Sequence, residues 1–326
     1  MGTMTRSDGR NEPATREAVI SALAGGDHFW LDLQGADADP EVPALLAEVF
    51  HFHPLAIEDA DHFGQRPKLE DYDDYAYMVA HGAVADGTGT IEVHIFVSEH
   101  YTVTLHRGDC PALAEVRIRL GRHHVSESAP MQVVLVYLIV DSLTDSFFPV
   151  LSAFDDQVDS LEDAILSQPT EEQLGTLFDM KRRLLSIRKV VTPQRDMFAA
   201  LSSGVVELPG MTTEGTRYFR DLYDHLIRIS DLVDNYRDLL SGVMDTHLST
   251  VSNRLNVVMK QLTIIATIFL PLSFLTGFFG QNFAALVTRI GSWETFVFLG
   301  IGTELVAVVG LLTMFKRRGW LGGPSA

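Results

Sequence analysis

The chain has 326 residues, one cysteine and a formal net charge of −18. This length suits a soluble domain of ordinary size plus a small membrane part. The single cysteine, Cys110, excludes a disulfide framework and a cysteine-based zinc site. Four basic and two acidic residues follow Lys260, a net of +2, so residues 1–260 carry −20. Such a surface repels nucleic acid and attracts cations, and no nucleic-acid partner is expected.

The first part of the chain mixes helix and strand signals. Residues 1–15 lack an apolar core, which excludes a signal peptide and predicts a disordered tail. Residues 16–130 are predicted to form an α/β domain. The expected strands are 29–33, 75–81, 91–98 and 101–106, the last two as a hairpin, and the expected helices are 40–50, 54–60 and 111–122.

From Met131 the pattern predicts helices only. Residues 131–166 are predicted as one helix, and Thr170 is a good N-cap for a second helix over 171–203. Residues 131–210 therefore read as an antiparallel helical hairpin. Its tip is rich in aspartate and glutamate, which is either a solvated face or a long-range attraction for cations.

A single long helix should follow Pro209-Gly210, because no proline occurs again before Pro271. Its stalk, residues 211–256, carries apolar residues at the 4–3 spacing of a coiled-coil seam. A second line consists of aspartates seven residues apart, at 224, 231, 238 and 245. One interpretation is a solvated stripe. The other is that, in a ring of subunits, the copies of Asp245 form a carboxylate cluster at the mouth of a pore.

Two apolar segments, 257–280 and 295–315, are long enough to cross a bilayer. Residues 281–294 form the outer loop, and the basic tail 316–326 places both termini in the cytoplasm of a cell (inner) membrane protein. Hydroxyls interrupt the first span at Thr263, Thr267, Ser273 and Thr276, as expected of a helix that faces a wet pore. Two helices cannot enclose a conduit, so a conducting protein must be an oligomer. The seam alone allows several ring sizes.

Two further features have alternative readings. Glu304, an acid within the second span, is either part of a proton relay or a carboxyl bonded to a neighbouring helix. The pairs His51/His53 and His123/His124 suggest a soluble metal sensor or a hydrolase. No third ligand follows at helical spacing and no nucleophile–base pair is evident, so isolated histidines are the better interpretation and no enzyme is expected.

Four segments together resemble the CorA family of divalent-metal transporters. They are residues 53–59 (HPLAIED), 66–68 (RPK), 218–225 (YFRDLYDH) and 256–271. The similarity extends from about residue 25 to the C-terminus. It implies a homopentamer with a cytoplasmic α/β funnel domain, a long stalk helix and two C-terminal transmembrane helices. Five first spans would line the pore, and five second spans would surround them.

The resemblance also assigns residues to roles. The Gly-Met-Asn signature of the outer mouth corresponds to Gly280, Gln281 and Asn282, with glutamine replacing methionine. An asparagine lower in the pore corresponds to Asn256. The apolar constrictions of the gate correspond to Met259, Leu262 and Leu270. The regulatory metal site between subunits corresponds to Asp86 and Asp221.

The implied cargo is Mg²⁺, which sheds water reluctantly and prefers oxygen ligands. The membrane potential suffices to drive inward flow of a divalent ion, and no nucleotide-binding motif is present. Cytosolic Mg²⁺ bridging Asp86 and Asp221 is expected to stabilise a closed ring. Nothing in the sequence excludes Co²⁺ or Ni²⁺ as further substrates. Because zinc-transporting relatives vary at the position of Gln281, the alternative is a Zn²⁺ transporter, with or without proton coupling.

Overall fold

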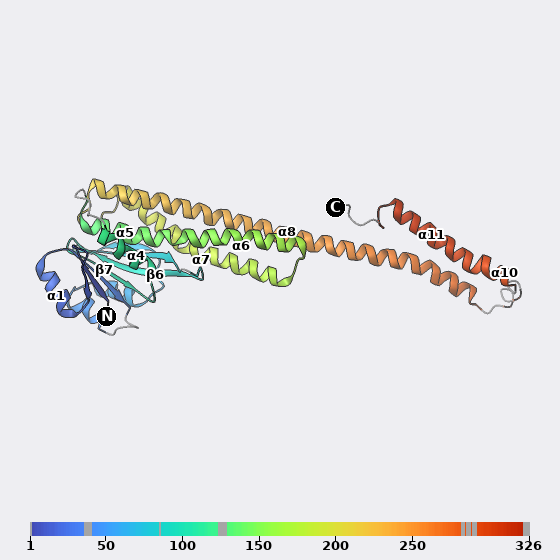
Figure 1. The fold of residues 1–326 in the computed structure, drawn as a ribbon, viewed down its shortest axis with the longest axis horizontal. Coiled ribbons are helices and arrows are strands. Elements are labelled where there is room, and N and C mark those ends of the chain that lie inside the picture. The colour runs from blue at the N-terminus through green and yellow to red at the C-terminus, as the bar shows by residue number, and fades with distance from the viewer. Residues whose placement is uncertain are drawn as a thin grey trace. The chain divides into compact units, whose positions relative to one another are not determined.

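The computed structural model describes residues 2–35, 41–84, 86–122, 129–281, 284, 288 and 292–321. The chain divides into two compact units, Met1–Asp245 and Thr246–Ala326. The first contains a mixed sheet and a set of long helices, and the second contains two apolar helices (Figure 1).

A seven-stranded sheet organises the first unit, in the order β2-β1-β3-β7-β6-β5-β4. Its strands are β1 (Thr3–Arg6), β2 (Asn11–Pro13), β3 (Phe29–Gln34), β4 (Lys68–Asp71), β5 (Ala76–Ala83), β6 (Thr90–Val97) and β7 (Tyr101–His106). Among these pairs only β3 and β7 run parallel. The predicted hairpin of β6 and β7 is confirmed, with Val93 opposite His106.

The predicted disorder of residues 1–15 is wrong. Strands β1 and β2 form an antiparallel hairpin, and β1 extends the sheet by pairing with β3, where Met4 lies opposite Leu31. Met4 is completely buried. The segment has few apolar residues, but backbone hydrogen bonds to the open edge of β3 and the burial of Met4, Thr5 and Ala14 are sufficient to order it.

Alternating side chains of the central strands enter two cores, one on each face of the sheet. In β5, Met78 and Ala80 face one core, and Tyr77 and Val79 face the other. Three short helices contribute to the second core: α1 (Arg16–Gly25), α2 (Val42–Glu48) and α3 (Pro54–Asp61). The first core is closed by α4 (Pro111–Arg122) and by longer helices.

The longer helices are α5 (Met131–Asp145), α6 (Phe147–Ser167), α7 (Glu171–Ser202) and α8 (Thr213–Phe279). A turn at Ser146 separates α5 from α6, where one helix was expected, because Pro149 has no N–H to donate to the preceding turn. The Thr170 N-cap is confirmed as a capping box with Gln173. Strand β4 pairs with β5 only as far as Val79. Beyond it, the Gln194 side chain of α7 accepts from His81 N and donates to His81 O.

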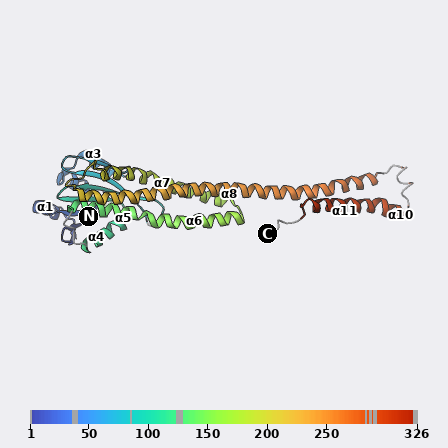
Figure 2. The ribbon, with the colours of Figure 1, turned by 90° about the horizontal axis from the view of Figure 1, so that it is seen from above.

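Helix α8 is continuous over 67 residues, as the absence of proline predicted. Its seam residues are all buried within one chain: Leu222, Leu226, Ile229, Val233, Tyr236, Leu240 and Val243. Figures 1 and 2 both show α6 and α7 beside this part of α8, and Phe154 of α6 contacts Tyr236. The seam therefore packs against the chain's own hairpin, and it carries no information on the number of subunits.

The second unit holds the membrane end of α8, then α10 (Trp293–Thr295), the π-helix η1 (Phe296–Ile301) and α11 (Gly302–Arg317). Three helical stretches are apolar enough to span a membrane, but the most apolar window of Met131–Ser167 is 61% buried in the protein. The corresponding windows of α8 and Trp293–Arg317 are 0% buried. The first is a core element, and the other two are the spans.

Candidate ion pathway and cation sites

The span of α8 presents the residues predicted for the gate on an uncovered surface. Met259, Leu262 and Leu270 are 65%, 66% and 75% exposed in a single chain, and Asn256 is also exposed. An α-helix turns about 100° per residue, so Asn256, Met259 and Leu270 fall within an arc of about 60°, and Leu262 lies about 60° beyond it. A surface this apolar requires lipid or other copies of the chain to cover it.

The first span ends in a hydrogen-bonded turn at the predicted outer mouth. Gly280 N donates to Thr276 O over 2.9 Å, and Gln281 N donates to Phe278 O over 3.3 Å. The Gln281 side chain is exposed and offers an amide oxygen at this end of the helix. Asn282 and most of the loop 281–294 lie outside the described residues, as do His123 and His124.

Thr276, one of the hydroxyls that the sequence placed towards a wet pore, contacts the second span in a single chain. Its hydroxyl lies 2.9 Å from Glu304 Oε1 of α11 and 2.7 Å from Leu272 O of its own helix. On the helix it lies about 100° beyond the arc of Asn256 and Leu270. Of the two readings of Glu304, the structure therefore supports a carboxyl bonded to the neighbouring helix.

Asp86 lies in the turn between β5 and β6, next to Gly87, whose φ is +68°. Its Oδ1 accepts hydrogen bonds from Thr88 N at 2.9 Å and Thr88 Oγ1 at 2.7 Å. These bonds and the positive charge of Arg183 lower the pKa of Asp86. The carboxylate is therefore charged at neutral pH and available to a cation.

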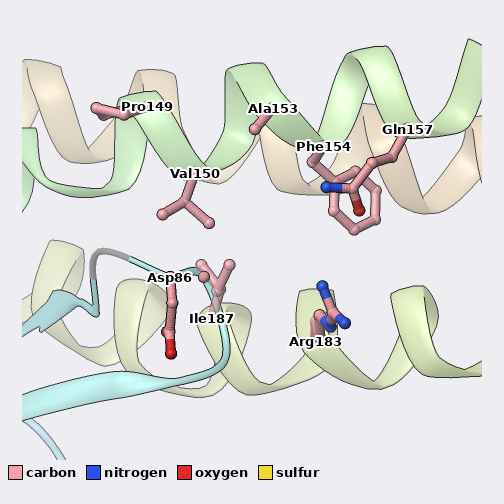
Figure 3. A pocket seen from close by; sticks show the side chains of 9 residues that line it. Asp86, Pro149, Val150, Ala153, Phe154, Gln157, Arg183 and Ile187 are labelled. Carbon is pink, nitrogen blue, oxygen red and sulfur yellow. The ribbon is translucent and has the colours of Figure 1, made fainter.

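A pocket of about 110 Å³ lies between this turn, α6 and α7. Figure 3 shows Asp86 and Arg183 on the same side of it, with Val150 and Phe154 of α6 opposite. The positively charged guanidinium of Arg183 therefore lies near Asp86. A metal ion that binds Asp86 must compete with that charge.

Asp221, the other residue predicted for the regulatory site, lies on α8 beside α5. Tyr137 Oη donates to Asp221 Oδ2 over 3.1 Å. His225, one turn further along α8, has Nε2 4.0 Å from Asp221 Oδ1. Its Nδ1 lies 3.8 Å from Asp141 Oδ1 and 3.9 Å from Asp145 Oδ1. Ligand atoms of Asp141, Asp145 and His225 all lie within 4.8 Å of one another.

These separations are those of ion pairs at their outer limit. Distances of 3.8–4.0 Å exceed hydrogen-bond length, so none of the three contacts of the His225 ring is a direct hydrogen bond. His225 Nδ1 has no hydrogen-bond partner in the part of the chain that the structure describes. Asp141 is 5% exposed, and Arg119 Nη1 neutralises one of its oxygens at 3.0 Å.

The electrostatics of this cluster also favour a cation. Burial and the charge of Asp141 raise the pKa of Asp145, since two nearby carboxylates resist ionising together. Burial, with Asp141 and Asp221, raises the pKa of Tyr137, which keeps its hydroxyl as a donor. A divalent ion among these groups would remove the repulsion.

Sequence reasoning named only Asp221 of this cluster. The signal for the others was present: Asp141/Asp145 and Asp221/His225 are each four residues apart, which places each pair on one helical face. What the sequence did not reveal is that these two faces meet. Among the described contacts none joins Asp86 to Asp221 within one chain.

The predicted line of aspartates on α8 is exposed at Asp224, Asp231, Asp238 and Asp245. Arg237 pairs with Asp238 at 3.1 Å. The stripe is open to solvent in a single chain, which agrees with either reading made from the sequence.

These features define a membrane protein with two C-terminal spans and a large acidic unit, in which carboxylates gather between α5 and α8. Residues 25–317 match the family described as CorA-like Mg²⁺ transporter protein. The chain belongs to this CorA family of divalent cation transporters.

Relatives and solved structures agree with that assignment. The cobalt/magnesium transport protein CorA of Thermotoga maritima is 34% identical over 94% of this chain and 87% of its own. The zinc transport protein ZntB of Yersinia enterocolitica is 30% identical, over 56% of this chain and 54% of its own. The complete structure of the CorA magnesium transporter from Methanocaldococcus jannaschii has a TM-score of 0.79 at 22% identity and covers 90% of this chain and 91% of its own. This last likeness supports the predicted fold of an α/β domain, a long helix and two C-terminal helices.

Proposed function

We propose that the protein is a homopentameric channel of the inner membrane that admits Mg²⁺, and also Co²⁺, down the electrochemical gradient. The observation that carries the proposal is the uncovered face of α8, where Asn256, Met259 and Leu270 share one arc. Other copies of the chain would cover this largely apolar face and bring the amide of Asn256 to a shared axis. Gly280, Gln281 and Asn282 would then surround the outer mouth. The basic residues 316–318 support termini in the cytoplasm.

Mg²⁺ is the cargo that the chemistry favours. The pathway offers amide and backbone oxygens, which can hold an ion that keeps its water shell. The membrane potential supplies about 2.3 kcal/mol per charge per 100 mV, so about 4.6 kcal/mol for a divalent ion. This driving force is sufficient without a second energy source.

Cytosolic Mg²⁺ is proposed to close the channel by joining subunits. An ion between Asp86 of one subunit and Asp221 of its neighbour would hold the ring symmetric, and its loss would let the carboxylates repel. The cluster of Asp141, Asp145 and His225 next to Asp221 would share that ion or hold a second one. Arg183 near Asp86 would compete with the ion and set the concentration at which closure occurs.

A test of gating compares the double variant D86K/D221K with D159K, which changes an exposed acid on α6 outside these clusters. Inhibition of flux by internal Mg²⁺ should be lost in the double variant and retained in D159K. Equal inhibition in both variants would reject the mechanism.

Zn²⁺ transport is the second candidate. It is favoured by the likeness to the zinc transport protein ZntB over 56% of this chain and by Gln281 in place of methionine. Proton coupling would distinguish such a transporter from a passive channel.

Flux into liposomes decides between the two. Uptake of Mg²⁺, Co²⁺ and Zn²⁺ would be measured with and without a pH gradient for the wild type, N282A and Q281M. The proposal expects Mg²⁺ uptake that needs no pH gradient, survives Q281M and is lost in N282A. Gradient-dependent Zn²⁺ uptake without Mg²⁺ flux would establish the alternative.

A further inference from the structure

The second span carries an acid, Glu304, whose only described side-chain partner outside its own helix is Thr276 of the first span, at 2.9 Å. We propose that Glu304 is a neutral positioning residue that ties the outer end of the pore helix to the second span. This inference rests on the proposed function for its transport consequence. The contact itself is independent of that function.

Counting hydrogens assigns the proton. The Thr276 hydroxyl has one hydrogen but lies within bonding distance of two oxygens, Leu272 O at 2.7 Å and Glu304 Oε1 at 2.9 Å. If Glu304 is protonated, its O–H donates to Thr276, and Thr276 donates to Leu272 O. Every group then has a partner. With an ionised carboxylate one of the two contacts lacks a hydrogen, and a charge within the bilayer is unfavourable.

The helix preceding Glu304 is built to direct it. Residues Phe296–Ile301 are π-helical, and Gly302 N donates to Val297 O five residues earlier. One extra residue per turn rotates everything that follows by about 100° relative to a regular α-helix. The Thr303 hydroxyl lies within hydrogen-bond distance of two carbonyl oxygens, Leu299 O at 2.5 Å and Gly300 O at 3.1 Å. The π-helix thus turns Glu304 towards α8.

A second contact ties the other end of the same helix pair. Lys260 Nζ lies 3.4 Å from Gly319 O, just beyond the end of α11. From Lys260 to Thr276 is 16 residues, and from Glu304 to Gly319 is 15 residues. These spacings, which differ by one residue, fit two antiparallel helices held in one register over about 24 Å. Glu304 is therefore the outer of two fixed points.

The outer contact matters because Thr276 also holds the turn of the outer mouth. Its carbonyl accepts from Gly280 N at 2.9 Å. Through Thr276, Glu304 fixes the rotation of the helix end that presents Gly280 and Gln281. It also keeps the Thr276 side of α8 against the second span, which leaves the arc of Asn256 and Leu270 free for the axis.

A double-mutant cycle in melting temperature tests the contact in the full-length protein, purified in detergent. T276V and E304A should each lower the melting temperature by about 2–4 °C, and the double variant should fall no further than either one. E304Q, whose amide can donate to Thr276, should stay near the wild type. T313V removes a second-span hydroxyl that bonds only Val309 O in the described structure, and serves as the matched control. Additive losses in the double variant would overturn the contact.

Mg²⁺ uptake into liposomes tests the role. T276V and E304A should lose most of the uptake rate, and E304Q should keep it. A loss in E304Q equal to that in E304A would overturn the neutral assignment and favour a charged or proton-carrying role. Full uptake in E304A would overturn the positioning role. If the wild type itself transports no ion, the proposed function fails. The double-mutant cycle in melting temperature still tests the contact between Thr276 and Glu304.

Discussion

The variant Asp145→Asn should change the protein's stability in opposite directions with and without a divalent cation. Asp145 lies within 4.8 Å of ligand atoms of Asp141 and His225. Two carboxylates at that distance repel by about 1 kcal/mol at the dielectric of water and about 3.5 kcal/mol at an effective dielectric of 20. The Asp145 side chain is 52% exposed, so the lower figure applies. The charges of His225 and Arg119 offset part of this repulsion, so without cations Asp145→Asn should stabilise the fold by up to about 1 kcal/mol.

With cations the sign reverses. An ion bound only by the folded state adds about 2.7 kcal/mol when its concentration is a hundred times its dissociation constant. The wild type should gain this stabilisation, and Asp145→Asn should lose most of it. The amide is a weaker ligand and leaves Asp141 as the nearest carboxylate of α5. Asp145→Asn should therefore be more stable than the wild type without cations, and less stable than the wild type at saturating Mg²⁺.

The assay is thermal unfolding in detergent, first with a chelator and then across a Mg²⁺ titration. Asp159→Asn removes the same charge from an exposed site on α6 and serves as the control for net charge. It should leave the Mg²⁺-dependent shift intact. Equal Mg²⁺ shifts in Asp145→Asn and the wild type would refute the cluster as a cation site. A less stable variant in the chelator would refute the repulsion argument.

Three other outcomes are expected. Phe219→Ala removes a buried ring 5.9 Å from Phe198, and should lower the free energy of unfolding by about 3–5 kcal/mol in denaturant; an unchanged midpoint would contradict the packing of α7 on α8. Burial lowers the pKa of His81 from 6.5 to about 4, despite Glu92 at 3.8 Å. In that pH window only the unfolded chain takes up the proton, so stability should fall by up to about 3 kcal/mol as pH drops from 6.5 to 4. The loss of stability between pH 6.5 and 4 should be smaller in His81→Gln. An equal fall in melting temperature with pH for the variant and the wild type would contradict this. Finally, 100 mV, inside negative, should favour Mg²⁺ accumulation in liposomes by about 4.6 kcal/mol, and uptake insensitive to the potential would contradict passive flow.

Much of the fold was readable because its signals are local. The length of α8 follows from the absence of proline before Pro271, and the hairpin follows from the cap at Thr170. The N-terminal strands were missed because their order depends on an edge of β3 that no local pattern reveals. The seam of α8 was found, but its partner was not: a 4–3 spacing predicts a buried stripe and does not say what buries it.

The candidate sites depended even more on tertiary contacts. Asp86 and Asp221 were identified only through resemblance, since a lone aspartate has no spacing to distinguish it. Asp141, Asp145 and His225 have helical spacing, but their meaning appears only when α5 and α8 lie together. Glu304 was noticed as an acid in a span. The choice between its two readings needed the position of Thr276.

Helix α8 has a different partner on each of its faces. Its seam is buried against the chain's own hairpin, and Thr276 faces the second span. Asp245 and Asn256 are 11 residues apart, close to three full turns, so both lie on one remaining face of the same helix. In an oligomer with the Asn256 arc at its axis, Asp245 would therefore add a ring of carboxylates near that axis. Such a ring would attract a cation that moves inward past Asn256.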